Sequence, residues 1–369
     1  MKLGMQKLRR IGEILASEVA LEHIPGAVMA VGIGKEIVYR EAFGFAENTD
    51  DHRRMMTVDT RFDLASLTKV TATLPAILIL VEQGALRLAD PVGLFIPEFA
   101  QGDKVQVMVW HLLAHCAGLL WHRKYDTLYA SPEEILQGIR SEPLVYAPGE
   151  KVVYSDLGFI LLGEIVQAVT GRTIDDFAAS SVFEPLGLTA TEFRPILSRF
   201  PNMAATILTS DSVSAEKFVR GQRPGLPCAV GVVNDDNARA LGGVAGHAGL
   251  FAPVDDLIKY VISWIDPVNS LLSGASREIS MRLHTEGTLS RRGLGWVLRQ
   301  DDHDHDPTGD LWPMTAVSHT GFTGTSIAFD PVSGLWTILL TNRVHYGLHV
   351  NIGGLRARLH NVVAAAAVD

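Results

Sequence analysis

The chain has 369 residues, 47% of them hydrophobic, which is enough to bury a large core. The formal net charge is −9, from 32 Lys and Arg against 41 Asp and Glu, and no run of basic residues occurs. This balance gives no electrostatic footprint for nucleic acid or an anionic membrane, so we expect a small-molecule or short-peptide substrate.

Two further features limit the class of protein. Cys116 and Cys228 are the only cysteines and lie far apart, which predicts two buried thiols rather than a disulfide framework or a metal site. Residues 1–26 predict an amphipathic helix, because their apolar positions recur at helical spacing. They do not resemble a signal peptide, because acidic residues interrupt any apolar stretch of that length. Without a signal peptide the chain as it stands would be cytoplasmic; if a signal was removed, it would be periplasmic or secreted. The longest apolar stretch, LPAILILV, is too short to span a bilayer, and the sequence leaves the oligomeric state open.

The elements expected along the chain alternate in type. Residues 26–47 predict a β-hairpin, and residues 64–92 a helix that Pro75 interrupts. Further helices are expected at 107–116, 131–141, 157–171 and 173–187, and a Gly-rich loop at 240–252 leads into another helix that ends near residue 265. Strands are expected within 293–300, 314–331 and 334–344, before a last helix at 352–368.

This order of elements predicts an α/β (α+β) fold in which both chain ends build one sheet. We expect residues 1–75 and 238–369 to form the sheet domain with its flanking helices. Residues 76–237 are expected to form a mainly helical second domain.

An S-x-x-K pattern, Ser66 to Lys69, opens the first long apolar helix. It can be a helix cap with a solvated lysine, or a nucleophile with its proton acceptor. The same pattern at Ser214 to Lys217, in a polar stretch with no helix after it, shows that the pattern alone is weak. At residue 66 the helix start would favour a developing oxyanion. The same positive end and the apolar surroundings predict a lowered pKa for Lys69.

Two further patterns carry chemistry. Tyr154 and Asp156 stand just before a helix, where a tyrosine is usually a core residue and Ser155-Asp156 usually an N-cap. Residues 317–326, VSHTGFTGTS, form a Gly-containing strand that could admit a substrate backbone and offer an N–H to an oxyanion.

In this order and spacing the three patterns resemble the S-x-x-K, Y-x-N and K-T-G boxes of the serine β-lactamases and penicillin-binding proteins. The resemblance is closest to the class C branch, which includes D-alanyl-D-alanine peptidases and related esterases. Segments such as RFDLASLTKV, YAPGEKVVYSDLGFILLGEIV and LLTNRV extend it over nearly the whole chain. It implies a transpeptidase-like fold with an antiparallel sheet.

The resemblance also implies roles for individual residues. Ser66 would be the acylated nucleophile, with Lys69 and Tyr154 handling its proton. The oxyanion hole would come from the backbone N–H groups of Ser66 and Phe322. The substrate-binding residues implied by the resemblance are Asp156, His319, Thr320, Gly321 and Phe322.

The chain departs from the pattern at two of these positions. His319 replaces the lysine of K-T-G, a variant also found in this family, and Asp156 replaces the usual asparagine. A carboxylate cannot donate to a substrate carbonyl as an amide does, which weakens the case for β-lactam or peptide turnover. An ionised Asp156 in the cleft would also raise the pKa of Lys69, against the lowering expected from burial and the helix end.

Other clusters are better explained without a site. His111 and His115 have the spacing of a zinc helix, but Leu112 stands where the glutamate belongs, so core packing is expected. Residues 301–310, DDHDHDPTGD, lack the EF-hand glycine and read as a solvated loop. His247 is expected to be loop scaffolding near the cleft.

The sequence therefore predicts a serine hydrolase that forms an acyl-enzyme on an ester, a D-amino-acid peptide or a β-lactam, without a cofactor or metal. One alternative is a non-hydrolytic protein of the same fold that binds penicilloyl groups or cell-wall peptide. Another is a metal-dependent hydrolase that uses the histidines.

Overall fold

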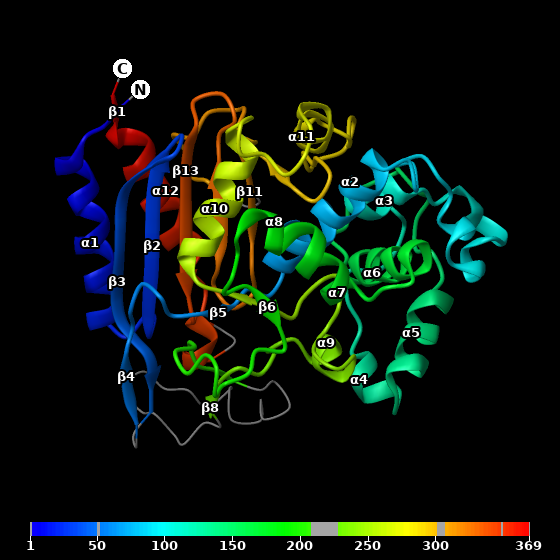
Figure 1. Cartoon of the computed structure of the whole chain (residues 1–369), viewed down its shortest axis with the longest axis horizontal. Helices are drawn as coiled ribbons and strands as arrows, with labels where there is room; N and C mark the ends of the chain where they lie inside the picture. The colour runs from blue at the N-terminus through cyan, green and yellow to red at the C-terminus, as the bar shows by residue number, and fades with distance from the viewer. Residues whose placement is uncertain (1, 50–51, 208–227, 301–306, 348–349, 369) are drawn as a thin grey trace.

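The computed structural model describes the chain except for residues 1, 50–51, 208–227, 301–306, 348–349 and 369. Its centre is a seven-stranded antiparallel sheet in the order β10-β11-β12-β13-β2-β3-β4 (Figure 1). These strands are β2 (Gly26–Ile33), β3 (Glu36–Asn48), β4 (Arg53–Met55), β10 (Val297–Leu298), β11 (Val317–Thr320), β12 (Ser326–Phe329) and β13 (Leu335–Thr341). Because β2 pairs with β13, the two chain ends build one sheet, as the sequence predicts.

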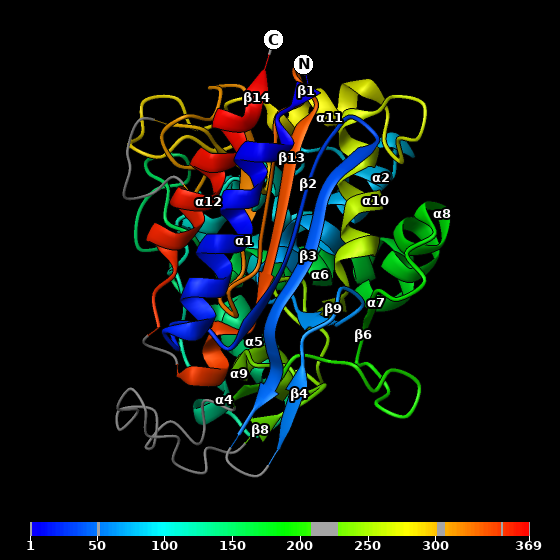
Figure 2. The same ribbon diagram turned by 90° about the vertical axis from the view of Figure 1, so that its left-hand side faces the viewer.

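Helices cover both faces of the sheet. On one face α1 (Met5–Ala20) and α12 (Gly353–Ala366) lie side by side (Figure 2) and bury Leu8, Ile11 and Leu359 against β2 and β13. On the other face α10 (Val254–Ile265) packs on the same two strands. The strand β2 is buried along seven of its eight residues, which explains its continuous apolar sequence.

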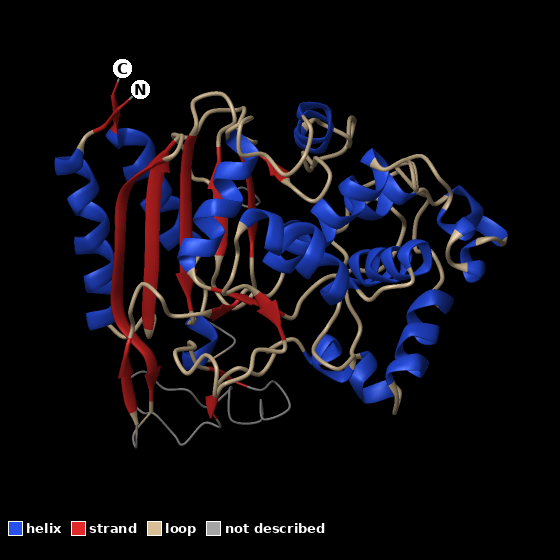
Figure 3. Ribbon diagram, in the orientation of Figure 1, coloured by secondary structure: helices blue, strands red, loops and turns tan. Residues whose placement is uncertain are grey.

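A mostly helical layer stands beside the second face of the sheet (Figures 1 and 3). It contains α2 (Leu74–Glu82), α3 (Val109–Leu113), α4 (Tyr125–Leu128), α5 (Pro132–Ser141), α6 (Asp156–Thr170), α7 (Ile174–Ala178), α8 (Glu184–Leu186) and α9 (Asp236–Ala240). The helix α11 (Gly274–Met281) lies near the end of the sheet. One apolar cluster runs from Val28 of the sheet to Val166 of α6, so the sheet and the helices share a core.

The helix expected at residues 64–92 differs in form and length. Residues Lys69–Thr73 form a π-helical turn, in which the N–H of Leu74 bonds to the carbonyl of Lys69, and α2 ends at Glu82. Pro75 lacks the N–H that an α-helical turn would use, so the wider turn replaces the α-helix there. The same arrangement recurs at Ala179–Phe183, just before Pro185. Each proline thus follows a π-helical turn inside a continuous helical segment, since residues 67–68 before the first turn are already α-helical.

Short strands complete the fold. They are β1 (Lys2–Leu3) with β14 (Ala367–Val368), β7 (Thr206–Ile207) with β8 (Cys228–Ala229), and β5 (Phe62–Asp63) with β9 (Leu250–Ala252) and β6 (Glu192–Phe193). Within the described ranges no single helix is long and apolar enough to cross a membrane. The pair Asp156–Thr170 and Ile174–Leu186 reaches that length and composition only together, with a bend of 75°.

The close approach of Gly246 to α6 gives a test of this packing. A Cβ at residue 246 would lie 2.0 Å from the carbonyl oxygen of Phe159. We expect Gly246→Ala to lower the free energy of unfolding by about 1–3 kcal/mol, because backbone must move to admit the methyl group. Gly274→Ala is the control, since a Cβ there meets nothing within 4 Å. Urea unfolding of both variants checks this, and equal stabilities would contradict it.

Candidate active site

The chain just before Ser66 is held in a sharp turn. Leu64 donates its N–H to the carbonyl of Leu250 at 2.9 Å, beside the β5–β9 pairing. The buried carboxylate of Asp63 accepts the N–H of Ala65 at 2.8 Å, and Ala65 has a φ of 47°. A left-handed residue other than glycine is uncommon and is kept only where its neighbours fix it. The turn therefore presents Ser66 in one fixed position at the start of the helical segment.

The turn between β11 and β12 clamps the same segment from the other side. Thr323 donates its hydroxyl to the carbonyl of Asp63 at 2.7 Å, and Thr325 donates to that of Leu64 at 3.0 Å. A Cβ at Gly321 would lie 2.4 Å from the Leu64 oxygen, so glycine is required for this approach. The T-G-x-T-x-T part of the late strand motif thus brings residues about 260 positions apart into contact.

Lys69 lies at the centre of the site and is fully buried. Its Nζ donates to Ser66 Oγ at 3.0 Å, to Asp156 Oδ1 at 2.8 Å and to the carbonyl of His247 at 3.2 Å. All three donors of an ammonium are therefore used. The lysine joins the S-x-x-K helix, the start of α6 and the Gly-rich loop in one network.

Tyr154 and Asp156 enter the site from the start of α6. Ser155 caps this helix by accepting the N–H of Gly158 at 3.4 Å. The Tyr154 ring lies 4.8 Å from Lys69 Nζ and 4.6 Å, centroid to centroid, from the ring of His115. The N-cap expected from Ser155-Asp156 is present, but it is formed by Ser155, which leaves the carboxylate of Asp156 free to bind Lys69.

The pKa of Lys69 is set by two opposing effects, both expected from the sequence. Burial is the largest influence and would lower this pKa, as predicted. The charge of Asp156, together with interactions with Tyr154, outweighs burial and raises the pKa above its ordinary value. Of the two opposing effects expected from the sequence, the charge of Asp156 prevails over burial. Lys69 is an ammonium at neutral pH.

The other two groups respond to this ammonium. Burial raises the pKa of Asp156, but the charge of Lys69 and a bond from His122 outweigh it, so this pKa lies below its usual value. Burial is also the largest influence on Tyr154 and raises its pKa, against the opposing effects of Lys69 and Ser66. At rest the site therefore holds a carboxylate, an ammonium and a neutral phenol around one serine hydroxyl.

The K-T-G-like residues lie on and after β11. His319 is buried, and its Nδ1 donates to the carbonyl of Thr320 at 2.9 Å, because a carbonyl can only accept. Burial, with the charges of Lys69 and Arg292, places the pKa of His319 well below its ordinary value, so the ring is neutral. Thr320 is the last residue of β11, Gly321 follows it, and Phe322 is 50% exposed.

Several residues near the site were not identified from sequence. His122 Nδ1 lies 3.6 Å from Asp156 Oδ2, and this carboxylate raises the pKa of His122. The guanidinium of Arg292 lies 5.9 Å from the Tyr154 ring. Asp63 could have been found, since it stands three residues before Ser66. Nothing in the sequence connects residues 122 or 292 with the boxes.

His247 acts through both its backbone and its ring. Its carbonyl accepts from Lys69, and its Nε2 bonds to Asp235 Oδ1 at 2.9 Å. Asp235 also caps α9 by accepting the N–H of Ala238 at 2.8 Å. His247 thus holds the loop through its ring, as expected, and its carbonyl also binds Lys69.

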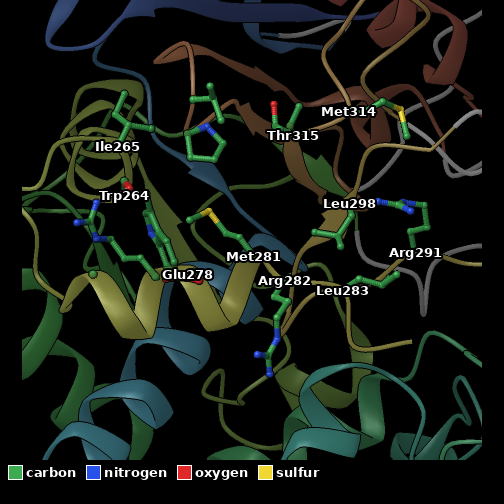
Figure 4. A pocket seen from close by; sticks show the side chains of 15 residues that line it. Trp264, Ile265, Glu278, Met281, Arg282, Leu283, Arg291, Leu298, Met314 and Thr315 are labelled. Atoms are coloured by element: carbon green, nitrogen blue, oxygen red, sulfur yellow. Dashed lines mark hydrogen bonds between the residues drawn. The ribbon is translucent and has the colours of Figure 1, made fainter. Parts of the chain in front are cut away.

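The remaining candidate clusters lie elsewhere. His111 Nδ1 accepts the N–H of Met108, and His115 Nδ1 accepts that of Ser155. Across the described ranges, no three His, Cys, Asp or Glu side chains gather as metal ligands. Residues 301–306 of the acidic loop lie outside the described part of the chain, as do Ser214 and Lys217. A separate pocket of about 520 Å³, lined by Met281, Arg291 and others, does not include Ser66, Lys69 or Tyr154 (Figure 4).

Comparison with known proteins agrees with this fold. The sequence model of the Beta-lactamase family matches residues 13–360. A protein of Escherichia coli (strain K12), named "Putative D-alanyl-D-alanine carboxypeptidase", is 30% identical over 93% of this chain and 83% of its own length. The chain therefore belongs to the Beta-lactamase family of serine hydrolases.

Solved structures show the same fold at lower identity. EstCE1, described as a hydrolase with promiscuous acyltransferase activity, superposes with a TM-score of 0.77 at 22% identity, covering 97% of this chain and 99% of its own. A penicillin-binding protein homologue from Caulobacter crescentus gives a TM-score of 0.75 at 22% identity, covering 100% and 99%. At this identity the likeness supports the fold alone.

The pairing of Lys69 with Asp156 gives a test by pH. In Asp156→Asn the buried lysine loses its partner, so its folded pKa falls below the unfolded value of about 10.4 and the variant is less stable at pH 7. The folded state then binds fewer protons than the unfolded state, so the variant's stability rises with pH by up to about 1.4 kcal/mol per unit.

The wild-type protein should show no such rise from Lys69, because its folded pKa lies above the unfolded one. The contribution of that lysine is complete below pH 10.4 and is lost only at higher pH. Urea unfolding between pH 7 and 10 measures the difference in free energy of unfolding between the wild type and Asp156→Asn. A difference that stays constant over this range would show that Asp156 does not control the charge of Lys69.

Proposed function

We propose that this protein hydrolyses an acyl substrate through an ester on Ser66. The observation that carries the proposal is the bond of 3.0 Å between Lys69 Nζ and Ser66 Oγ, in a site that Tyr154 also lines. A serine oxygen beside a fixed cation and a second proton-transfer group has the parts that nucleophilic catalysis needs.

The charges of the site support one assignment of roles. Lys69 is an ammonium and cannot accept a proton, so we assign the proton of Ser66 to the phenolate form of Tyr154. Tyr154 is a neutral phenol at rest, so it first releases its own proton to solvent. Ser66 Oγ then forms a bond to the substrate carbonyl carbon as the C=O π bond opens to an oxyanion, and the proton of Ser66 moves to the Tyr154 oxygen. Tyr154 then gives that proton to the leaving group as the carbonyl reforms. In the second half of the reaction water attacks the acyl carbon and gives its proton to Tyr154, which then protonates Ser66 Oγ as the bond between Ser66 and the acyl group breaks. Lys69 offsets negative charge throughout.

The oxyanion is proposed to bind the N–H groups of Ser66 and Phe322. The clamp that Thr323 and Thr325 form on residues 63–64 supports this, because it fixes both segments relative to each other. Donors that are already oriented stabilise the oxyanion without reorganisation during the reaction.

The choice of substrate depends on Asp156. Its Oδ1 bonds to Lys69 and its Oδ2 faces His122, so it offers a substrate no donor. We therefore propose esters as better substrates than β-lactams or D-alanyl peptides. The exposed side chains of Trp121, adjoining Asp156 through a backbone bond, and Phe322 suit an apolar acyl group.

A second candidate is D-alanyl-D-alanine carboxypeptidase activity, which the name of the E. coli relative suggests. A third is a non-hydrolytic binder that is acylated without turnover. Both would react at Ser66, so the nucleophile and the substrate need separate experiments.

The first experiment is labelling with a fluorophosphonate. We expect one adduct, on Ser66, because among the serines that the structure describes only this one has the fixed turn, the ammonium and the phenol around it. Ser66→Ala should abolish the adduct and Ser214→Ala should retain it, as read by intact mass and peptide mapping. An adduct on Ser214, or none on either serine, would sink the assignment.

The second experiment measures substrate preference. We expect the wild-type protein to turn over p-nitrophenyl acetate with a higher kcat/KM than nitrocefin or a D-alanyl-D-alanine peptide. Asp156→Asn should move the ratio towards nitrocefin by about tenfold, since one neutral hydrogen bond of about 1–1.5 kcal/mol is gained. Effects through Lys69 reach both substrates and cancel in the ratio. An unchanged ratio would remove the basis for ester preference, and stoichiometric acylation without turnover would favour the binder.

A further inference from the structure

Arg292 stands in a tight turn that brings it beside Tyr154. It forms an isolated bridge with Val297, and its N–H bonds to the hydroxyl of Thr285 at 3.0 Å. The turn is anchored to the helical layer by a bond of 2.8 Å from the N–H of Gly295 to the carbonyl of Leu113. The backbone that carries Arg292 is therefore held on two sides, and its guanidinium lies 5.9 Å from the ring centroid of Tyr154.

This guanidinium has no anionic partner among the described residues. Its Nη1 is buried without a hydrogen-bond partner, and its Nε reaches Ser290 Oγ only at 3.4 Å. Burial lowers the pKa of Arg292 to about 10, and Tyr154 is the one charge-bearing group that opposes this. Arg292 is partly buried, and leaving its enclosed Nη1 donor without a partner is costly, so the position of this cation requires a reason.

Two cations lie near Tyr154, Lys69 with a paired carboxylate and Arg292 with none among the described residues. The charged or titratable groups that face the phenol are Lys69, Asp156, His115, His319 and Arg292. Burial is the main reason that the pKa values of His115 and His319 lie well below normal, so both rings are neutral. Lys69 is paired with Asp156 at 2.8 Å, and the two charges act in opposite directions on the pKa of Tyr154, which Lys69 lowers and Asp156 raises.

We propose that Arg292 is an electrostatic positioning residue that stabilises the anionic form of Tyr154 when Tyr154 takes the proton of Ser66. The inference rests on the proposed function, because it needs Tyr154 to act as the base. His319 carries no charge at the position where the K-T-G box has lysine, so Arg292 supplies the cation from a different segment. No bond is formed or broken at Arg292 itself.

The test uses the neutral ester p-nitrophenyl acetate and the pH dependence of kcat/KM. Below the pKa of Tyr154 the rate follows the fraction of phenolate, and a cation at this range favours the phenolate by about one pKa unit. Arg292→Gln should therefore lower kcat/KM at pH 7 by about tenfold and move the alkaline rise to higher pH by about one unit. Arg292→Lys, which keeps the charge, should restore most of both.

The matched control is Arg291→Gln. The neighbouring Arg291 bonds through its Nε to the carbonyl of Arg299 and lines the separate pocket of Figure 4, so its loss should leave the pH profile unchanged. Arg292→Met is a second neutral variant, in case the glutamine variant fails to fold. Melting temperatures of all variants confirm that folded protein is compared.

A double-mutant cycle with Tyr154→Phe decides whether Arg292 acts through Tyr154. In the Tyr154→Phe background, Arg292→Gln should cause no further loss. An equal loss in both backgrounds, an unshifted pH profile, or a loss confined to the KM of carboxylate-bearing substrates would overturn the proposal, the last in favour of a substrate-anion site. Failure of Ser66 labelling would instead refute the proposed function. Labelling thus tests the nucleophile, and the pH profile and the double-mutant cycle test Arg292.

Discussion

The buried ammonium of Lys69 is the interaction on which the rest of the site depends. Its three hydrogen bonds join segments that are distant in the sequence, around residues 66, 156 and 247. An ammonium in a dry interior is tolerated only where a carboxylate and full hydrogen bonding offset its desolvation. The sheet, the start of α6 and the Gly-rich loop must therefore all be in place before the lysine can be buried. The same requirement fixes Ser66 relative to Tyr154.

The site also differs from a serine paired with a neutral lysine base, because its lysine is charged. Asp156 keeps Lys69 protonated, which removes the lysine from service as a base and leaves that task to a phenol. The cation then stabilises whichever neighbouring oxygen becomes negative. This division of labour follows from a single carboxylate at the position where an amide is usual.

Much of the fold could be predicted because its signals are local. The apolar strand at 26–33, the helix stop at Gly171 and the order of elements along the chain all depend on near neighbours. Pro75 was identified as an interruption, but the π-helical turn before it was not, since its form depends on packing. Ser66, Lys69 and Tyr154 could be selected because their motifs are short and ordered. Arg292 and His122 could not, because only the folded backbone brings them to the site.

The pairing of β2 with β13 has a consequence for how the chain folds. Register partners such as Ala30 and Ile338 are separated by most of the sequence, so the pairing in the middle of the sheet raises the contact order of the fold. During synthesis the hairpin β2–β3 emerges first and must wait, with one buried edge uncovered, until the last tenth of the chain is made. An exposed apolar edge is a template for aggregation, and this interval is where chaperones would protect the growing chain. The strand order that joins the two ends of the molecule thus makes its folding slow.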